Sequence, residues 1–196
     1  MKQQLQMILF VLILGTVTSG LLVGADTLTK DRIALNQQAE LQSAILDAYD
    51  ISYNITQIAS VFEEHIEVIE SEDKTFFVHR DSGSLSFRIE GNGVWGPING
   101  VLTLENDLKT IRRITILQEE ETPGLGGVIS ERWYLDKFVG REMTPELLIS
   151  RSPDLSNPNE VDAIAGGTRT SERFETLINA SFQSHIDAWN ALNGGQ

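Results

Sequence analysis

The sequence predicts an α+β fold, in which a single N-terminal transmembrane helix precedes one domain with a central antiparallel sheet flanked by helices. Three observations predict it. An uncharged apolar stretch lies near the N-terminus, short β-branched or aromatic runs fill the middle, and a long amphipathic pattern closes the chain. The expected divisions are an anchor over 1–26, a helical lead-in over 27–70 and the domain over 71–196.

The apolar stretch predicts a membrane anchor. Residues 7–25 carry no charge, and with Leu5 they reach the roughly 20 residues that span a hydrocarbon core. A cleaved signal peptide is the alternative, because Val23-Gly24-Ala25 resembles a small-residue cleavage site. The run exceeds the ~7–15 apolar residues of a signal peptide, which favours an anchor contacting lipid through residues 5–25. Either reading places the soluble part outside the cytoplasm.

Periodicity predicts the elements of the soluble part. Apolar residues recur at helical spacing over 27–50, 55–68 and 171–192, and a short helix is expected over 130–138. Strands are expected at 75–80, 84–90, 98–105 and 111–119, with a further short strand at 146–150. Because turn residues separate the four central runs, they predict a small antiparallel sheet.

Composition excludes several function classes. The net charge is −13 and every Asp and Glu lies beyond residue 25, which argues against a nucleic-acid partner. The absence of cysteine excludes thiolate metal sites, protein-ligated iron–sulfur clusters and disulfides. His65, His79 and His185 are scattered without ligand spacing, so no metal site is expected; His65 and His185 are expected at the core edge or the surface. The motifs of common hydrolases and P-loop proteins do not occur.

One glycine-rich segment, Glu-Thr-Pro-Gly-Leu-Gly-Gly over 121–127, could approach a ligand closely. It is not a dinucleotide fingerprint, because the third glycine position falls on Ile129. Taken alone it is an ordinary turn. On a strand Glu119 and Glu121 would share a face opposite Glu120, so the acidic run is no ready-made acid/base pair.

A second segment, Asp-Ala-Ile-Ala-Gly-Gly-Thr-Arg-Thr-Ser over 162–171, directly precedes the last helix. Its small residues leave room for a ligand, and the unpaired N–H groups at a helix start suit a phosphate, to which Arg169 could add charge. The alternative is a Gly-Gly turn followed by a helix cap on Thr168, Thr170 or Ser171.

Together with Gly-Val-Trp-Gly-Pro-Ile-Asn-Gly over 93–100, these segments resemble the FMN-binding domain family, which includes the G subunit of Rnf complexes and the C subunit of Na⁺-translocating NADH:quinone oxidoreductase (Na⁺-NQR). The family's flavinylation motif, D-x-x-(S/T)-G-A-T, corresponds to residues 162–168. Ala165 stands where the family has Ser or Thr, and Gly167 where it usually has Ala. The likeness covers most of the chain, with the three motifs in family order.

The resemblance implies FMN joined covalently by a phosphoester to Thr168, with Thr170 as the fallback acceptor. It implies that the isoalloxazine ring lies against the 121–127 loop. The expected cofactor-binding residues are Thr168, Thr122, Leu125, Gly126, Gly166, Gly167, Trp95 and Glu121, with Asp162 recognised by a flavin transferase. For Trp95, a core aromatic covering the sheet is an equal alternative.

The function implied is an electron-carrier subunit, not catalytic alone, of a membrane-bound ion-translocating oxidoreductase complex. Its partners would be neighbouring redox subunits and the flavin transferase, in a bacterial or archaeal membrane with the domain extracytoplasmic. The length resembles the Rnf protein and Gly-Val-Trp-Gly-Pro-Ile the Na⁺-NQR protein, so the resemblance does not choose between them. The alternatives are a free-standing flavin domain serving another reductase, and a non-redox scaffold.

Overall fold

The computed structural model describes residues 2–71, 74–154 and 156–194. It contains two compact units, Met1–Glu40 and Leu41–Gln196. The domain boundaries expected after residues 26 and 70 remain predictions.

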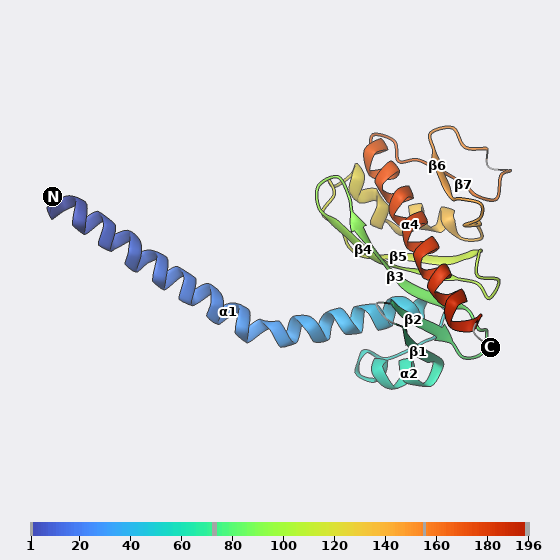
Figure 1. Cartoon of the computed structure of the whole chain (residues 1–196), viewed down its shortest axis with the longest axis horizontal. Coiled ribbons are helices and arrows are strands. Elements are labelled where there is room, and N and C mark those ends of the chain that lie inside the picture. Colours follow the sequence, from blue (N-terminus) through green and yellow to red (C-terminus); the bar gives the residue numbers. More distant parts are fainter. Residues whose placement is uncertain (1, 72–73, 155, 195–196) are drawn as a thin grey trace. The chain divides into compact units, whose positions relative to one another are not determined.

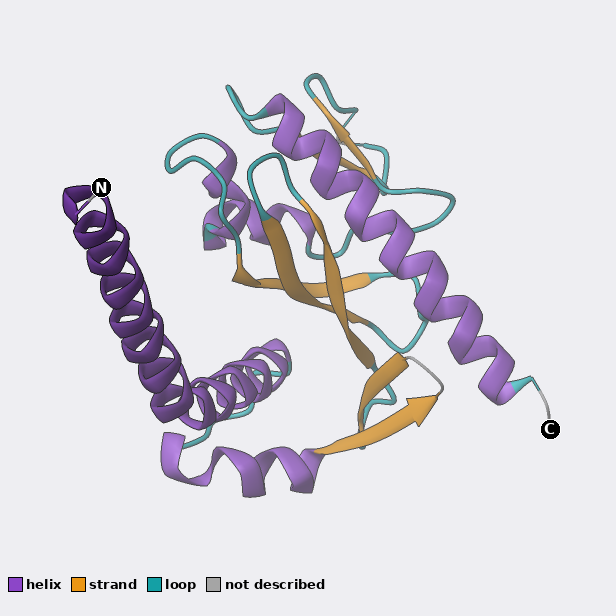
Figure 2. Cartoon of the chain, turned by 60° about the vertical axis from the view of Figure 1, so that its left-hand side comes forward, coloured by secondary structure: helices purple, strands orange, loops and turns teal. Residues whose placement is uncertain are grey.

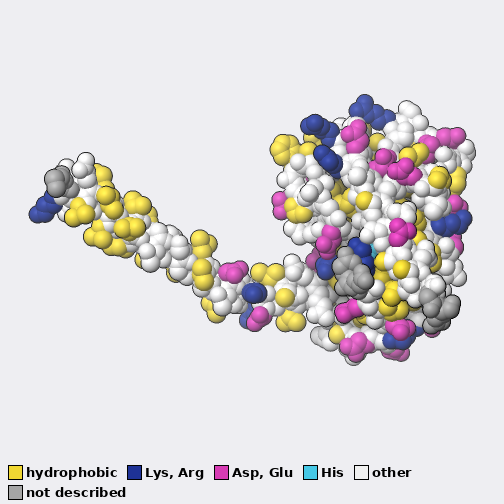
Figure 3. Space-filling view, in the orientation of Figure 1, with side chains coloured by type: hydrophobic (Ala, Val, Ile, Leu, Met, Phe, Trp, Pro, Cys, Tyr) yellow, Lys and Arg dark blue, Asp and Glu magenta, His cyan; other side chains and the backbone are white. Residues whose placement is uncertain are grey.

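The N-terminal unit is helical. It holds most of α1 (Lys2–Ala48) (Figure 1), and among the described residues α1 is the one helix long and apolar enough to cross a membrane. Hydrophobic side chains cover much of its N-terminal surface (Figure 3). The hydroxyls of Thr16 and Thr18 donate to the carbonyl oxygens of Leu12 and Leu14, each at 2.8 Å. This bonding satisfies polar side chains within an otherwise apolar helix.

The second unit is built on a five-stranded sheet in the order β1-β2-β3-β4-β5, in which every neighbouring pair is antiparallel. The strands are β1 (Ile66–Ser71), β2 (Lys74–His79), β3 (Leu85–Asn92), β4 (Pro97–Leu104) and β5 (Ile111–Gln118). On β3 the fully buried Leu85, Phe87 and Ile89 alternate with residues on the opposite face. The predicted antiparallel sheet is confirmed.

Helix α4 (Thr168–Asn193) runs across one face of this sheet and packs against β3 (Figure 2). Its apolar stripe joins the hydrophobic core through Phe174, Leu177, Ile178 and Phe182. The approach is close at Gly91, where a Cβ would lie 2.8 Å from Leu177 Cδ1. The opposite face receives the end of α1, where the Tyr49 hydroxyl shares a 3.0 Å hydrogen bond with Ser86 Oγ.

The remaining elements are short. They are the 3₁₀ helices η1 (Ile55–Gln57), η2 (Gly126–Ser130) and η3 (Asp136–Phe138), the helices α2 (Ile58–His65) and α3 (Arg132–Leu135), and a parallel pair of strands, β6 (Leu148–Ser150) and β7 (Glu160–Asp162). The helix expected over 55–68 is wrong beyond His65, because residues 66–71 pair with β2 as a strand. Strand β7, three residues long, was not expected from periodicity.

Candidate functional site

The three glycine-containing motifs meet at one carboxylate. Glu121 follows β5 and is only 5% exposed. Its Oε1 accepts the backbone N–H groups of Val94 at 2.7 Å and Trp95 at 3.2 Å, and its Oε2 accepts the Thr170 hydroxyl at 2.6 Å. Glu121 therefore holds both the 93–100 loop and the start of α4 against its own loop.

Two glycines make room for this carboxylate. A Cβ on Gly126 would lie 2.5 Å from Thr170 Oγ1 and 2.6 Å from Glu121 Oε2. A Cβ on Gly93 would overlap Glu121 Oε1. These approaches are far closer than van der Waals contact, so larger residues at the two positions would push the loops apart.

The start of α4 is arranged without a hydroxyl cap. The capping residue is Gly167, whose side-chain position offers no acceptor, and Thr168 is the first helical residue. Ser171 Oγ accepts the Ile164 N–H at 3.0 Å and donates to the Gly167 carbonyl at 3.1 Å. The expectation that Thr168, Thr170 or Ser171 caps the helix is therefore wrong, and the first-turn N–H groups keep their capacity to bind an anion.

The segment before Thr168 lies against the 121–127 loop. Gly166 has a φ of +79°, and a Cβ there would lie 2.9 Å from Leu125 Cδ2. A Cβ on Gly167 would lie 2.9 Å from Ile164 Cγ2 and 3.3 Å from the Leu125 carbonyl oxygen. Packing against the β-branched Ile164 thus explains why glycine suits position 167 in this chain.

The two threonines differ in accessibility. Thr168 is half-buried, whereas Thr170 is 5% exposed and its hydroxyl is bound to Glu121. Substituting either residue therefore tests a different property, because only Thr170 contributes to holding the loops together.

A cavity of about 440 Å³ opens beside this helix start. It is lined by Gly93, Val94, Arg169, Glu172, Arg173 and Thr176. Arg169 and Arg173 stand four residues apart on one exposed face of α4, next to the positive end of the helix dipole. The volume is in the range of small-ligand sites, and the two guanidinium groups suit the phosphate of a flavin mononucleotide. The exposed apolar side chains of Trp95 and Leu125 suit a flat ring system.

Apart from Thr168 and Trp95, the predicted site residues fall into three groups. Glu121, Leu125, Gly126, Gly166 and Gly167 lie together around the junction just described. Thr122 is on the exposed turn that continues from Glu121. Asp162, at the end of β7, pairs with Lys137 at 3.2 Å.

Two features differ from the sequence expectations. Trp95 is 73% exposed, so its interpretation as a core aromatic covering the sheet is wrong. Arg173 and the backbone N–H of Val94 were not expected at the site. The four-residue spacing from Arg169 could have indicated Arg173, but no sequence pattern reveals a backbone donor.

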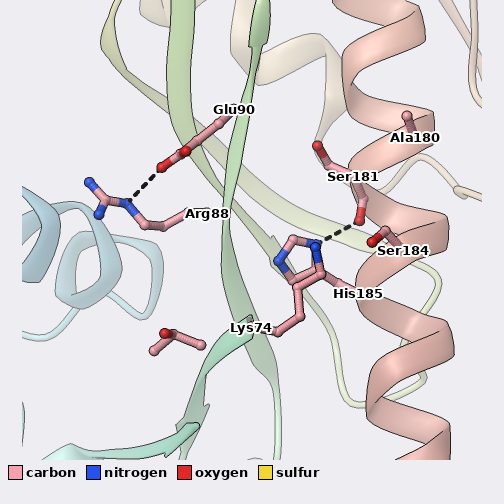
Figure 4. A pocket seen from close by; sticks show the side chains of 8 residues that line it. Lys74, Arg88, Glu90, Ala180, Ser181, Ser184 and His185 are labelled. Atoms are coloured by element: carbon pink, nitrogen blue, oxygen red, sulfur yellow. Dashed lines mark hydrogen bonds and ion pairs between the residues drawn. The ribbon is translucent and has the colours of Figure 1, made fainter. Parts of the chain in front are cut away.

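A separate cavity of about 370 Å³ lies between α4 and the edges of β2 and β3 (Figure 4). Its wall includes His185, whose Nδ1 is 2.7 Å from the Ser181 carbonyl oxygen and whose ring stacks on Phe87 at 4.3 Å. Arg88 and Glu90 form an ion pair at 3.6 Å on the other side. His185 therefore lies at the core edge, as the sequence predicts.

The antiparallel sheet with its covering helix, and the junction of glycine loops beside a helix start, define a cofactor-binding domain. Residues 93–183 match the family model described as FMN-binding domain, and this range contains all three motifs. The similarity to the FMN-binding domain family thus lies in this part of the chain.

Curated relatives come from two Na(+)-translocating oxidoreductases. The C subunit of the Na(+)-translocating NADH-quinone reductase from Yersinia pestis is 27% identical over 171 residues, covering 82% of this chain and 59% of the relative. The G subunit of the Na(+)-translocating ferredoxin:NAD(+) oxidoreductase complex from Acetobacterium woodii is 36% identical over 94 residues, covering 45% of each. The chain thus spans less than two thirds of the length of either relative.

Solved structures share the fold. NqrC of Shewanella oneidensis superposes with a TM-score of 0.66 at 17% identity, covering 76% of this chain and 93% of that one. The C subunit of the Na(+)-translocating NADH-quinone reductase from Parabacteroides distasonis gives a TM-score of 0.66 at 21% identity, covering 79% and 94%. These similarities support the fold alone.

Proposed function

We propose that this chain is an electron-carrier subunit of a membrane-bound complex of the Na⁺-NQR or Rnf type, with FMN attached through a phosphoester to the Thr168 hydroxyl. The observation that carries the proposal is the meeting of the three family motifs at Glu121, directly beside the start of α4. The relatives named above, from both complexes, support the same assignment.

Different residues of the chain would bind the phosphate and the ring of the cofactor. The first-turn N–H groups of α4, with Arg169 and Arg173, would bind the phosphate. The exposed Trp95 and Leu125 would contact the ring. The flavin supplies the one- and two-electron chemistry, and the protein orients it through these contacts.

The choice of Thr168 over Thr170 rests on accessibility. The Thr170 hydroxyl is buried and donates to Glu121, so modifying it would remove a bond that ties the site together. Thr168 is half-buried on the first helical turn, where an attached phosphate would meet the positive end of the dipole.

The apolar part of α1 would anchor the chain in lipid through residues 5–25, with the second unit on the extracytoplasmic side of a bacterial or archaeal membrane. A covalent link would retain FMN there, where a dissociated cofactor is lost by dilution. Neighbouring redox subunits of the complex would donate and accept the electrons, and a flavin transferase recognising Asp162 would attach the cofactor.

The test is co-expression of the full chain with a flavin transferase, followed by in-gel flavin fluorescence under denaturing conditions and intact-mass measurement. We expect wild type and Thr170→Val to carry flavin and the isosteric Thr168→Val to carry none. Fluorescence kept by Thr168→Val and lost from Thr170→Val would overturn the site. An unmodified wild-type mass would instead support a non-redox scaffold.

A second measurement separates a component of a complex from a free-standing flavin domain. Affinity purification of the full chain from its native membrane in mild detergent should recover multi-spanning redox subunits. Recovery of a flavinylated chain without such partners would favour the free-standing domain.

A further inference from the structure

A second cluster of chemically active side chains, which we call the histidine corner, comprises His65, His79 and Asp81. His65 ends α2, His79 ends β2, and Asp81 lies in the turn that follows β2. One potential ligand atom from each of the three lies within 4.8 Å of the others. The β1–β2 ladder pairs Ile66 with His79, which brings the two histidines together although they are fourteen positions apart in the sequence.

Hydrogen bonds assign the tautomer of His79. Its Nδ1 lies 2.8 Å from Ser82 Oγ. Ser82 Oγ donates its own proton to Ser84 Oγ at 2.9 Å and accepts the Ser84 N–H at 3.2 Å. Because the Ser82 proton is already used, Ser82 accepts from His79 Nδ1–H, and Nε2 carries the lone pair. Metal-binding histidines are commonly oriented by such a bond from the opposite ring nitrogen.

The His79 ring is also held in place by stacking. It stacks on Tyr49 at 4.3 Å between ring centres, and the His65 ring lies nearly parallel to it at 6.5 Å.

The cations near the corner are balanced by carboxylates. Arg112 pairs with Glu105 at 3.2 Å and with Asp50 at 3.9 Å. Arg80, the residue after His79, pairs with Glu67 at 3.8 Å. These ion pairs reduce the repulsion that a bound cation would meet, and Asp81 adds a negative charge on the exposed side.

We propose that His65, His79 and Asp81 bind a divalent transition metal of the Zn²⁺ class, through two imidazole nitrogens and one carboxylate oxygen, with water completing the coordination. Such mixed N/O sets suit Zn²⁺ rather than Mg²⁺ or Ca²⁺, which prefer oxygen ligands. Tetrahedral Zn²⁺ ligands lie roughly 3.4 Å apart. The three atoms lie within 4.8 Å of one another, so small side-chain rotations would bring them to these separations around the ion.

The metal would clamp the end of α2 to the turn after β2, because its ligands come from both elements. None of the three residues lines the cavity beside Thr168 or contacts Glu121. The proposal is therefore independent of flavin attachment, and either can fail without the other. It also revises the sequence expectation of no metal site, which considered only spacing along the chain.

The experiment is calorimetric titration of Zn²⁺ into the metal-free full chain in detergent, purified without a polyhistidine tag. We expect saturable binding of one Zn²⁺ per chain and no comparable binding of Mg²⁺. His65→Ala and His79→Ala should abolish binding. Asp81→Asn should weaken it at least tenfold, and Ser82→Ala, which removes the bond that orients His79, about tenfold.

Two controls test whether a change in binding is nonspecific or results from misfolding. Asp187→Asn, on an exposed carboxylate bound to Gln183, should bind Zn²⁺ like wild type. His79→Ala also removes a stacked ring and could disturb folding, so Asp81→Asn provides the variant at an exposed position, and melting curves in EDTA check all variants. Zn²⁺ should raise the Tm of wild type and not that of the histidine variants. Absence of saturable binding by wild type would overturn the proposal. So would ligand variants that bind Zn²⁺ with the affinity of wild type.

Discussion

Polar side chains gather at two places in the second unit, around Glu121 and at the histidine corner, and they are bonded in opposite ways. The Glu121 carboxylate is buried and accepts three hydrogen bonds from the chain itself. At the corner, one ring nitrogen of His79 bonds Ser82, and one potential ligand atom from each of His65, His79 and Asp81 lies within 4.8 Å of the others.

The difference indicates that Glu121 positions loops, whereas the histidine corner is suited to binding a ligand. A carboxylate that accepts hydrogen bonds within the protein holds loops in place, and in the proposed flavin site the neighbouring Thr168 carries the cofactor. In the proposed metal site, the ligand atoms of the cluster would form their further bonds to the ion. Substitution of Glu121 itself should therefore lower stability and flavin attachment together, whereas substitutions of ligand atoms at the corner should chiefly change metal affinity.

The largest effect is expected for Glu121→Ala. It leaves the N–H groups of Val94 and Trp95 and the Thr170 hydroxyl without their acceptor, and leaving such buried donors unsatisfied costs about 3 kcal/mol. Chemical denaturation of the full chain in detergent would measure the loss, and in-gel fluorescence would report reduced flavinylation.

The matched control is Glu120→Ala, which removes an exposed carboxylate one residue earlier. It should change the free energy of unfolding by less than about 0.5 kcal/mol. Equal losses in the two variants would mean that Glu121 has no special positioning role.

Gly126→Ala should have the next largest effect, about 2 kcal/mol, because its Cβ would enter the space between Thr170 Oγ1 and Glu121 Oε2. Gly127→Ala is the control, since its Cβ would meet nothing closer than 3.4 Å. Thermal unfolding of both variants checks the prediction. A Tm for Gly126→Ala as high as that for Gly127→Ala would contradict close packing around the carboxylate.

Local patterns predicted most of the fold. In the four central strands the apolar residues alternate, and in α4 they recur at helical spacing. Both patterns are visible within a few residues of sequence. The boundary at His65 was missed because Ile66 and Val68 fit a strand only when β2 is present to pair with them. A pairing partner is not visible within a short window of sequence.

The site was less predictable than the fold. The glycine loops and Thr168 were found from motifs, but their meeting at Glu121 depends on tertiary contacts between segments up to 49 positions apart. The histidine corner was missed for the same reason, because only the β1–β2 pairing unites His65 with His79. Exposure of Trp95 likewise depends on where its loop lies on the folded domain.

Gly83→Ala should cost about 1–2 kcal/mol, because Gly83 adopts a φ of +70° in the turn that contains Ser82. Open space surrounds the position, so the cost is backbone strain alone. Gly83→Asn should recover much of it, since asparagine tolerates this conformation. Denaturation curves of the two variants test this. Equal losses of stability in the two variants would show that the positive φ of Gly83 is not the cause. At Gly126, by contrast, the expected cause is steric overlap.

Tyr49→Phe should have the smallest effect, about 1 kcal/mol, from loss of the hydrogen bond to Ser86. Burial raises the pKa of Tyr49 to about 12 from its ordinary value of 10.0, partly offset by the Ser86 hydrogen bond and Arg112. The unfolded phenol therefore ionises first, so the contribution of Tyr49 is complete below pH 10 and is lost as the pH rises toward 12. Unfolding curves across this interval should show a weaker pH dependence in Tyr49→Phe than in wild type.

The aromatic ring that stacks on His79 is retained in Tyr49→Phe, so the Zn²⁺ affinity of this variant should match that of wild type. A large loss of affinity would mean that the Tyr49 hydroxyl, rather than the stacked ring, supports the corner.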